Sequence, residues 1–167
     1  MRRRTTRAGV AAVFGLALSI ASHGQPSEPL LMNPFHDPFM PATAGRPCPA
    51  PLGPAYTEAA RRAESHSRVE RGTSCWLAGK CAEPNAYRYD IANAKAAVAA
   101  LQAESSLAAS AIWVTAQRRF IYLEGCVADP AQAAKAEAVV RALPDIDQVI
   151  PALALPGERT PYARARP

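Results

Sequence analysis

The chain has 167 residues, a length that suits one domain with attached segments rather than several domains. Its 19 lysines and arginines exceed its 14 acids, but four of the arginines lie in the first seven residues, where no acid accompanies them. The rest of the chain has a net charge of only +1. That charge is too small for the basic surface of nucleic-acid-binding proteins, so nucleic acid is not an expected partner.

The N-terminus has the three parts of a secretory signal peptide. Arginines come first, the apolar run AGVAAVFGLALSI covers residues 8–20, and small residues follow at Ala21, Ser22 and Gly24. The run is shorter than the ~20 residues that a membrane-spanning helix needs. No cysteine lies near the cleavage zone to carry a lipid anchor. We expect residues 1–24 to be removed and the protein to be periplasmic or secreted; cleavage after Ala21 or after Gly24 fits equally.

Residues 25–56 contain nine prolines. Because proline fixes φ and lacks a backbone N–H, this composition predicts an extended arm without a helix or an interior strand. Within the arm, the sequence NPFHDPF places Phe35 and Phe39 beside prolines. The two rings are candidates for contact with a protein partner or a surface. Packing on the protein's own domain is the alternative, and we favour it.

Residues 57–89 predict a short polar helix followed by a loop. The helix is expected to run from Thr57, which can cap it, to Arg71, with Gly72 ending it. Two glutamate–arginine pairs, Glu58–Arg62 and Glu64–Arg68, have the four-residue spacing at which side chains meet on a helix.

The four cysteines predict two disulfides, because an even number in an exported chain is typical of a disulfide framework. Three connectivities are possible. We favour Cys75 with Cys81, which close the small loop SCWLAGKC and leave Cys48 with Cys126 to tie the arm to the domain. A zinc site is the rival interpretation, but this spacing lacks a companion histidine pair. No metal and no cofactor are therefore expected.

Residues 90–155 have the periodicities of an αββαβ unit. A helix capped by Asp90 is expected to bury Ile91, Ala94, Val98 and Leu101, which follow at helical spacing. Two alternating strands follow around the turn 117–119, and Asp129-Pro130 opens a second helix. Pro151 lies in the last strand, which should therefore be an edge strand. The expected fold class is α+β: a three-stranded sheet with two helices on one face. Its predicted core contains Ile112, Val114, Leu123, Val140 and Val149. Residues 156–167 are expected to be a disordered basic tail.

The stretch from Asp90 to Leu155 resembles the BON domain, a small module of bacterial osmotically induced and nodulation-type proteins. The resemblance depends most on the aliphatic-x-Leu-x-Gly-x-Val signature, which is Ile121, Leu123, Gly125 and Val127 in this sequence. We expect Gly125 to end its strand. The family usually has glycine in the hairpin and before the last strand, where this chain has Gln117-Arg118-Arg119 and Asp145. Asp145 tolerates left-handed backbone better than most residues do.

The resemblance implies binding or tethering at the cell envelope without catalysis. Residues 90–155 hold five bases and seven acids, which does not favour a general attraction to anionic lipid. Arg118 and Arg119 are candidates for a local lipid or partner contact; solvated turn residues are the favoured alternative. The expected partner is a phospholipid surface, or else an envelope protein that contacts the proline-rich arm. No small-molecule substrate is expected, and paired cysteines and dispersed histidines argue against a catalytic site.

Overall fold

The computed structural model describes residues 29–165, so the expected signal peptide and the first residues of the arm lie outside the described part of the chain. The fold is mixed α+β, as predicted. The elements in chain order are β1 (Leu31–Met32), β2 (Phe39–Ala44), β3 (Ala55–Tyr56), α1 (Glu58–Leu77), the 3₁₀ turn η1 (Ala86–Tyr89), α2 (Asp90–Ala103), the 3₁₀ turn η2 (Ser105–Leu107), β4 (Ala111–Gln117), β5 (Phe120–Cys126), α3 (Pro130–Arg141) and β6 (Gln148–Ala154).

The main sheet has four strands in the order β2-β4-β5-β6, so the prediction of a three-stranded sheet was wrong. The fourth strand, β2, comes from the proline-rich arm and pairs antiparallel with β4. Pro41 is tolerated because β2 lies at an edge, and the register shifts between Pro41 and Thr43. β6 is parallel to β5 at the other edge, which confirms the placement of Pro151. β1 and β3 form a separate two-stranded sheet.

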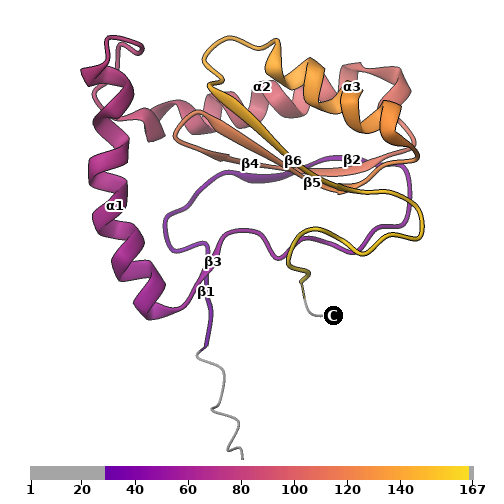
Figure 1. Ribbon diagram of the computed structural model, residues 1–167, viewed down its shortest axis with the longest axis horizontal. Coiled ribbons are helices and arrows are strands. Elements are labelled where there is room, and N and C mark those ends of the chain that lie inside the picture. The colour runs from indigo at the N-terminus through magenta and orange to yellow at the C-terminus, as the bar shows by residue number, and fades with distance from the viewer. Residues whose placement is uncertain (1–28, 166–167) are drawn as a thin grey trace, which may run out of the picture.

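Helices α2 and α3 lie together on one face of the sheet and enclose the core (Figure 1). The five predicted core side chains are all at most 5% exposed. Asp129 caps α3, with Pro130 at its start, as predicted. The stripe of α2 differs from expectation, because Ile91 is 50% exposed while Ala94, Ala97 and Leu101 are fully buried.

Gly125 is required by a close approach between two strands. A Cβ at this position would lie 2.0 Å from the carbonyl oxygen of Ala111, and the residue has a φ of 147°. No other amino acid fits there without moving the backbone. β5 continues to Cys126, so the expectation that Gly125 ends the strand was wrong.

The hairpin between β4 and β5 turns through two arginines with left-handed backbone. Arg118 and Arg119 have φ values of 46° and 70°. The carboxylate of Asp90 accepts the backbone N–H of Arg118 at 2.8 Å and that of Arg119 at 2.9 Å. Asp90 therefore holds the turn and does not cap α2, whose first flanking residue is Tyr89. Asp145 is also left-handed, with a φ of 61°.

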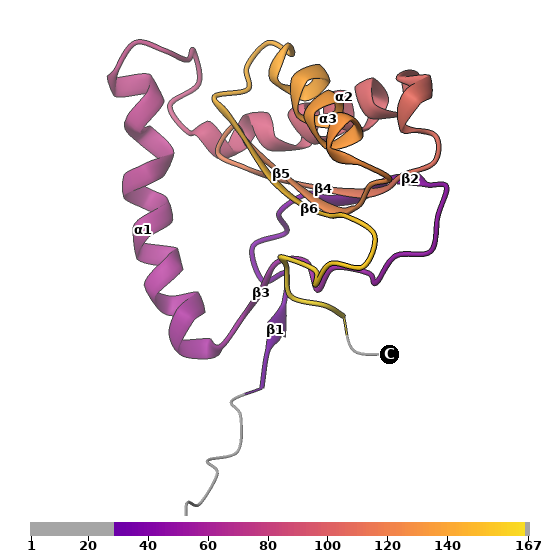
Figure 2. The ribbon, with the colours of Figure 1, turned by 45° about the vertical axis from the view of Figure 1, so that its right-hand side comes forward.

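α1 is longer than predicted and stands apart from the sheet at one end of the molecule (Figures 1 and 2). Thr57 caps it by accepting the backbone N–H of Ala60. Gly72 does not end the helix but lies buried inside it, where a Cβ would approach the side chains of Asn85 and Tyr87. Cys75 is consequently helical rather than part of a loop.

The second face of the sheet is covered by the arm and the C-terminal segment, which run side by side beneath it (Figure 1). Leu52 donates its N–H to Ala163, and Ala165 donates to Ala50. The expectation of a disordered tail was wrong for residues 156–165, because these backbone hydrogen bonds give the segment a defined path.

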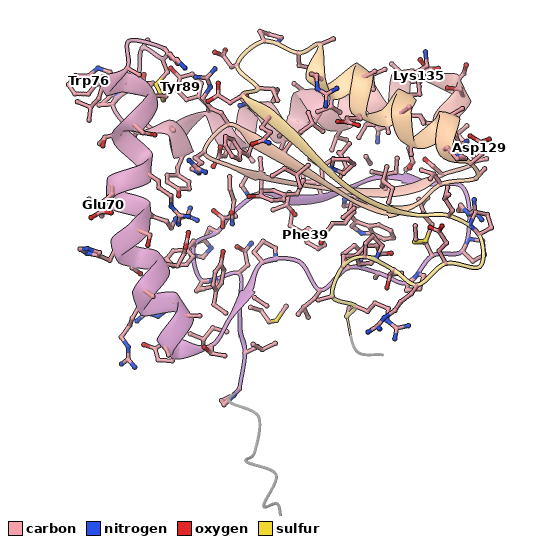
Figure 3. The ribbon with its side chains drawn as sticks, in the orientation of Figure 1. Phe39, Glu70, Trp76, Tyr89, Asp129 and Lys135 are labelled. Carbon is pink, nitrogen blue, oxygen red and sulfur yellow. A yellow bond between two sulfur atoms is a disulfide. The ribbon has the colours of Figure 1, made fainter. Side chains whose placement is uncertain are left out.

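Both favoured cysteine pairs are disulfides. Cys48–Cys126 joins the arm to the end of β5, and Cys75–Cys81 joins the end of α1 to the following loop. They lie on opposite sides of the molecule, one of them beside Trp76 (Figure 3).

Candidate functional site

The aromatic residues of the arm pack on the protein itself. The Phe35 ring meets the Tyr56 ring edge-on at 5.2 Å, and the Arg68 guanidinium of α1 lies 4.5 Å from the Phe35 centroid. Phe39 begins β2, and its ring packs against the later part of the arm (Figure 3), where a Cβ on Gly53 would lie 3.0 Å from it. Phe35 and Phe39 therefore fit the favoured interpretation, in which they pack on the protein's own surface and hold the arm in place.

A buried carboxylate connects the arm, α1 and β4. Asp37 is 4% exposed and receives two hydrogen bonds from the Arg68 guanidinium, at 2.6 and 3.0 Å. Gln117 donates to the same carboxylate at 2.6 Å and to the Tyr56 hydroxyl at 3.2 Å. Arg68 was expected to pair with Glu64, which instead pairs with Arg71. Bidentate arginine–carboxylate geometry makes this a structural anchor for α1.

Arg119 is not available for a lipid or partner. Its side chain is 8% exposed and lies between Asp147, at 3.3 Å, and Asp145, at 3.9 Å. Its guanidinium also donates to the carbonyl oxygens of Asp145 and Lys80. Arg118 lies over the Phe120 ring at 4.2 Å and is half-buried. The two arginines therefore form no joint surface patch.

Burial perturbs the pKa of Asp90, the residue that holds the hairpin. Desolvation raises the pKa of its carboxyl to about 6, against the lowering effect of the two backbone hydrogen bonds from Arg119 and Arg118. The negative charge of Asp37 acts in the same direction as desolvation, and Arg68 opposes it. This carboxyl lies where α2, the hairpin and the arm meet, and its contacts support a structural role.

Three exposed apolar side chains lie close together in the sequence of α1. Trp76 is 47% exposed, and Val69 and Leu77 are each 73% exposed. Trp76 points away from the sheet at the C-terminal end of α1, and Glu70 lies on the same outer side (Figure 3). Val69 and Trp76 are seven residues apart, which places them on one helix face. We call Val69, Trp76 and Leu77 the outer apolar patch.

The region that carries this patch is basic, whereas the αββαβ unit is acidic. Residues 57–89 hold six bases and four acids. Lys80 follows the patch directly and has no acidic partner among the residues that the structure describes. Sequence reasoning missed this surface because it ended the helix at Arg71 and placed Trp76 and Leu77 in a loop. Their seven- and eight-residue spacing from Val69 was the available signal.

The described residues give no support for a metal or thiol site. Residues 29–165 contain no group of three His, Cys, Asp or Glu side chains arranged to hold a metal ion. All four cysteines are in disulfides, and His36 and His66 are exposed on separate segments. No helix within the described range is long and apolar enough to cross a membrane.

The comparison with known families decides what the sheet and its two helices are. Residues 90–157 match the family model of the BON domain. This segment is a single BON domain. The match spans α2 to β6 and leaves the arm, α1 and most of the C-terminal segment outside, so β2 is added to the BON sheet by the arm. No curated protein and no solved structure matches the chain. BON domains are associated with phospholipid binding and with the cell envelope.

Proposed function

We propose that this BON-domain protein is exported, is not an enzyme, and binds the phospholipid surface of the cell envelope through the outer apolar patch of α1. The observation that carries the proposal is the exposure of Trp76 and Leu77 at the end of a helix that stands away from the sheet. The BON domain supplies the association with phospholipid, and α1 supplies a surface suited to it.

The chemistry of the patch suits the boundary between lipid headgroups and acyl chains. Tryptophan is enriched at that boundary because its ring is apolar and its indole N–H is polar. Lys80 lies three residues after Leu77 and can approach anionic headgroups, contributing about 1 kcal/mol near a charged membrane. The acidic αββαβ unit would then face away from the membrane.

The fluorescence of Trp76 provides a direct test. The chain has two tryptophans, so a Trp113→Phe variant leaves Trp76 as the only one. Adding vesicles that contain anionic phospholipid should shift its emission to shorter wavelength and make it sensitive to a quencher in the acyl region. Raising the salt concentration should weaken binding, because salt screens the basic groups.

Flotation with the same vesicles measures how much Trp76 contributes to vesicle affinity. Trp76→Ala should lower vesicle affinity about tenfold, since burial of a large apolar side chain contributes roughly 1.5–3 kcal/mol. Ile91→Ala is the matched control: it removes an exposed apolar side chain from α2 and should leave affinity unchanged. Equal flotation of wild type and Trp76→Ala, or no flotation at any lipid composition, would refute the proposal.

A second candidate function is docking of an envelope protein on the arm. One observation favours it: Leu30 and the two residues of β1, Leu31 and Met32, are 48%, 38% and 59% exposed. Deleting the arm would remove β2 and Cys48, so point variants are the better test. Loss of a specific cross-linked partner in Leu31→Ser/Met32→Ser, with vesicle binding retained, would favour this function over lipid binding.

A further inference from the structure

A cavity lies away from the outer apolar patch, where the arm meets the C-terminal segment. It has a volume of about 480 Å³, within the range of small-ligand sites. Its walls come from the arm near Arg46, the ends of β5 and β6, and residues 155–164. Most of the cavity lies outside the BON segment, which ends at residue 157.

Three arginines line this cavity: Arg46, Arg159 and Arg164. Of the eleven arginines between residues 29 and 165, seven have a carboxylate within 4.0 Å. The other four are these three and Arg118, which lies over an aromatic ring. The unpaired guanidinium groups are therefore concentrated at one place. The single acid in the lining, Glu158, accepts the backbone N–H of Leu155 at 3.3 Å.

The Arg46 side chain has a buried N–H group without a hydrogen-bond acceptor in residues 29–165. Its Nε–H is enclosed by protein and has no hydrogen-bond acceptor among the described residues. Buried polar groups are almost always hydrogen-bonded, so an enclosed guanidinium N–H without an acceptor is unfavourable. An anion with several oxygens in the cavity would supply acceptors for this side chain after a small adjustment.

The walls are held in place before any ligand arrives. The disulfide Cys48–Cys126 fixes the arm to β5, and the Tyr162 hydroxyl donates to the carbonyl oxygen of Pro49 at 2.8 Å. The backbone of residue 164 bridges to Pro51. A pre-formed site of this kind avoids much of the entropic cost of binding.

We propose that this cavity binds a small phosphate-bearing anion. Planar guanidinium groups recognise phosphate oxygens through paired hydrogen bonds. With three arginines and one acid, the lining has a net charge of +2. The cavity has room for more than an inorganic phosphate ion, which suits a phosphomonoester of the size of glycerol phosphate. The proposal is independent of the outer apolar patch.

Calorimetric titration of the full-length protein with inorganic phosphate and with glycerol 3-phosphate tests the site. Saturable binding is expected, tighter for glycerol 3-phosphate. Arg46→Gln and Arg164→Gln should each weaken it about tenfold or more. Arg46→Lys should weaken it nearly as much, because lysine keeps the charge but cannot donate in pairs. Arg141→Gln on α3 is the matched control, since it removes the same charge elsewhere and should leave binding unchanged.

Vesicles with and without phosphatidic acid distinguish a lipid phosphate from a free one. If Arg46→Gln abolishes vesicle binding and Trp76→Ala keeps it, the ligand of this cavity is a lipid headgroup. If Trp76→Ala abolishes vesicle binding and Arg46→Gln keeps it, while wild type still binds phosphate in the titration, the ligand is a free phosphate compound. Absence of saturable binding to any of these probes would overturn the proposal. Equal binding by wild type and a folded Arg46→Gln variant would also overturn it.

Discussion

The two faces of the four-stranded sheet are covered in different ways. α2 and α3 cover one face with apolar side chains, of which Ile112, Leu123 and Val140 are fully buried. The arm and the C-terminal segment cover the other face through backbone hydrogen bonds and a disulfide, and they leave a cavity of about 160 Å³ beside Tyr122 and Glu124. The first face has the dense packing of a domain core, whereas the second is held by cross-links.

The acidic group on the second face illustrates its different character. Burial raises the pKa of the Glu124 carboxyl, and this side chain has no ion-pair or hydrogen-bond partner among the residues that the structure describes. A core face does not tolerate such a group, because an unpaired buried carboxylate is costly. A partly open face beneath an arm tolerates it. The second face of this BON domain is therefore partly open, with a cavity between the sheet and the arm.

The largest expected effect comes from the cross-link of the second face. Cys48 and Cys126 are 78 residues apart, so loop-closure entropy predicts a loss of about 4–5 kcal/mol in the free energy of unfolding for Cys48→Ser/Cys126→Ser. Cys75 and Cys81 are only 6 residues apart, and their double replacement should cost about 2 kcal/mol. Urea denaturation of the two double variants measures both losses. Equal losses would show that the arm is not held by the disulfide.

The second prediction compares side chains from opposite faces of the sheet. Leu123 is fully buried under the helices, and its replacement by alanine should lower the free energy of unfolding by about 3–4 kcal/mol. Ile150 lies next to the core residue Val149 in β6, points to the second face and is half-buried, so Ile150→Ala should cost about 1 kcal/mol. Urea denaturation of both variants measures the two losses in the free energy of unfolding. Comparable losses would mean that the second face is also a packed core.

The sequence predicts the first face well, because the signals there are local. Alternation places Ile112 and Val114 on one side of a strand, and Asp129-Pro130 marks the start of a helix. The added strand β2 was not predictable from its prolines, since its pairing with β4 depends on residues about 70 positions away. Gly72 resembles a helix terminus in the sequence, but it is the position where α1 packs closely against Tyr87.

The candidate site was harder to predict than the fold, for a physical reason. Whether an arginine is free depends on partners that are distant in the chain: Asp37 pairs with Arg68, and Asp147 with Arg119. The arginine cavity requires the C-terminal segment to return to the arm, which no local pattern in residues 156–167 indicates. The disulfides were predictable because four cysteines permit few pairings and one pair is close in sequence.

The smallest expected effect concerns Asp90, at the junction of the two regions. Its pKa of about 6 in the folded protein exceeds the ordinary value of 3.8, so the folded state holds this proton more tightly than the unfolded state does. Between about pH 4 and pH 6, unfolding therefore releases a proton, and rising pH lowers the free energy of unfolding by up to about 3 kcal/mol from this group. Asp90→Asn should remove that slope, while its lost acceptor lowers stability at all pH values.

Urea denaturation of wild type and Asp90→Asn at several pH values isolates the effect. The difference between the two curves should change between pH 4 and pH 6 and stay constant outside that range. Because Arg68 opposes the rise in the pKa of Asp90, an Arg68→Gln variant should raise this pKa further and extend the slope to higher pH. Parallel curves for wild type and Asp90→Asn would mean that water reaches this carboxyl. The hairpin, α2 and the arm would then not form one closed junction.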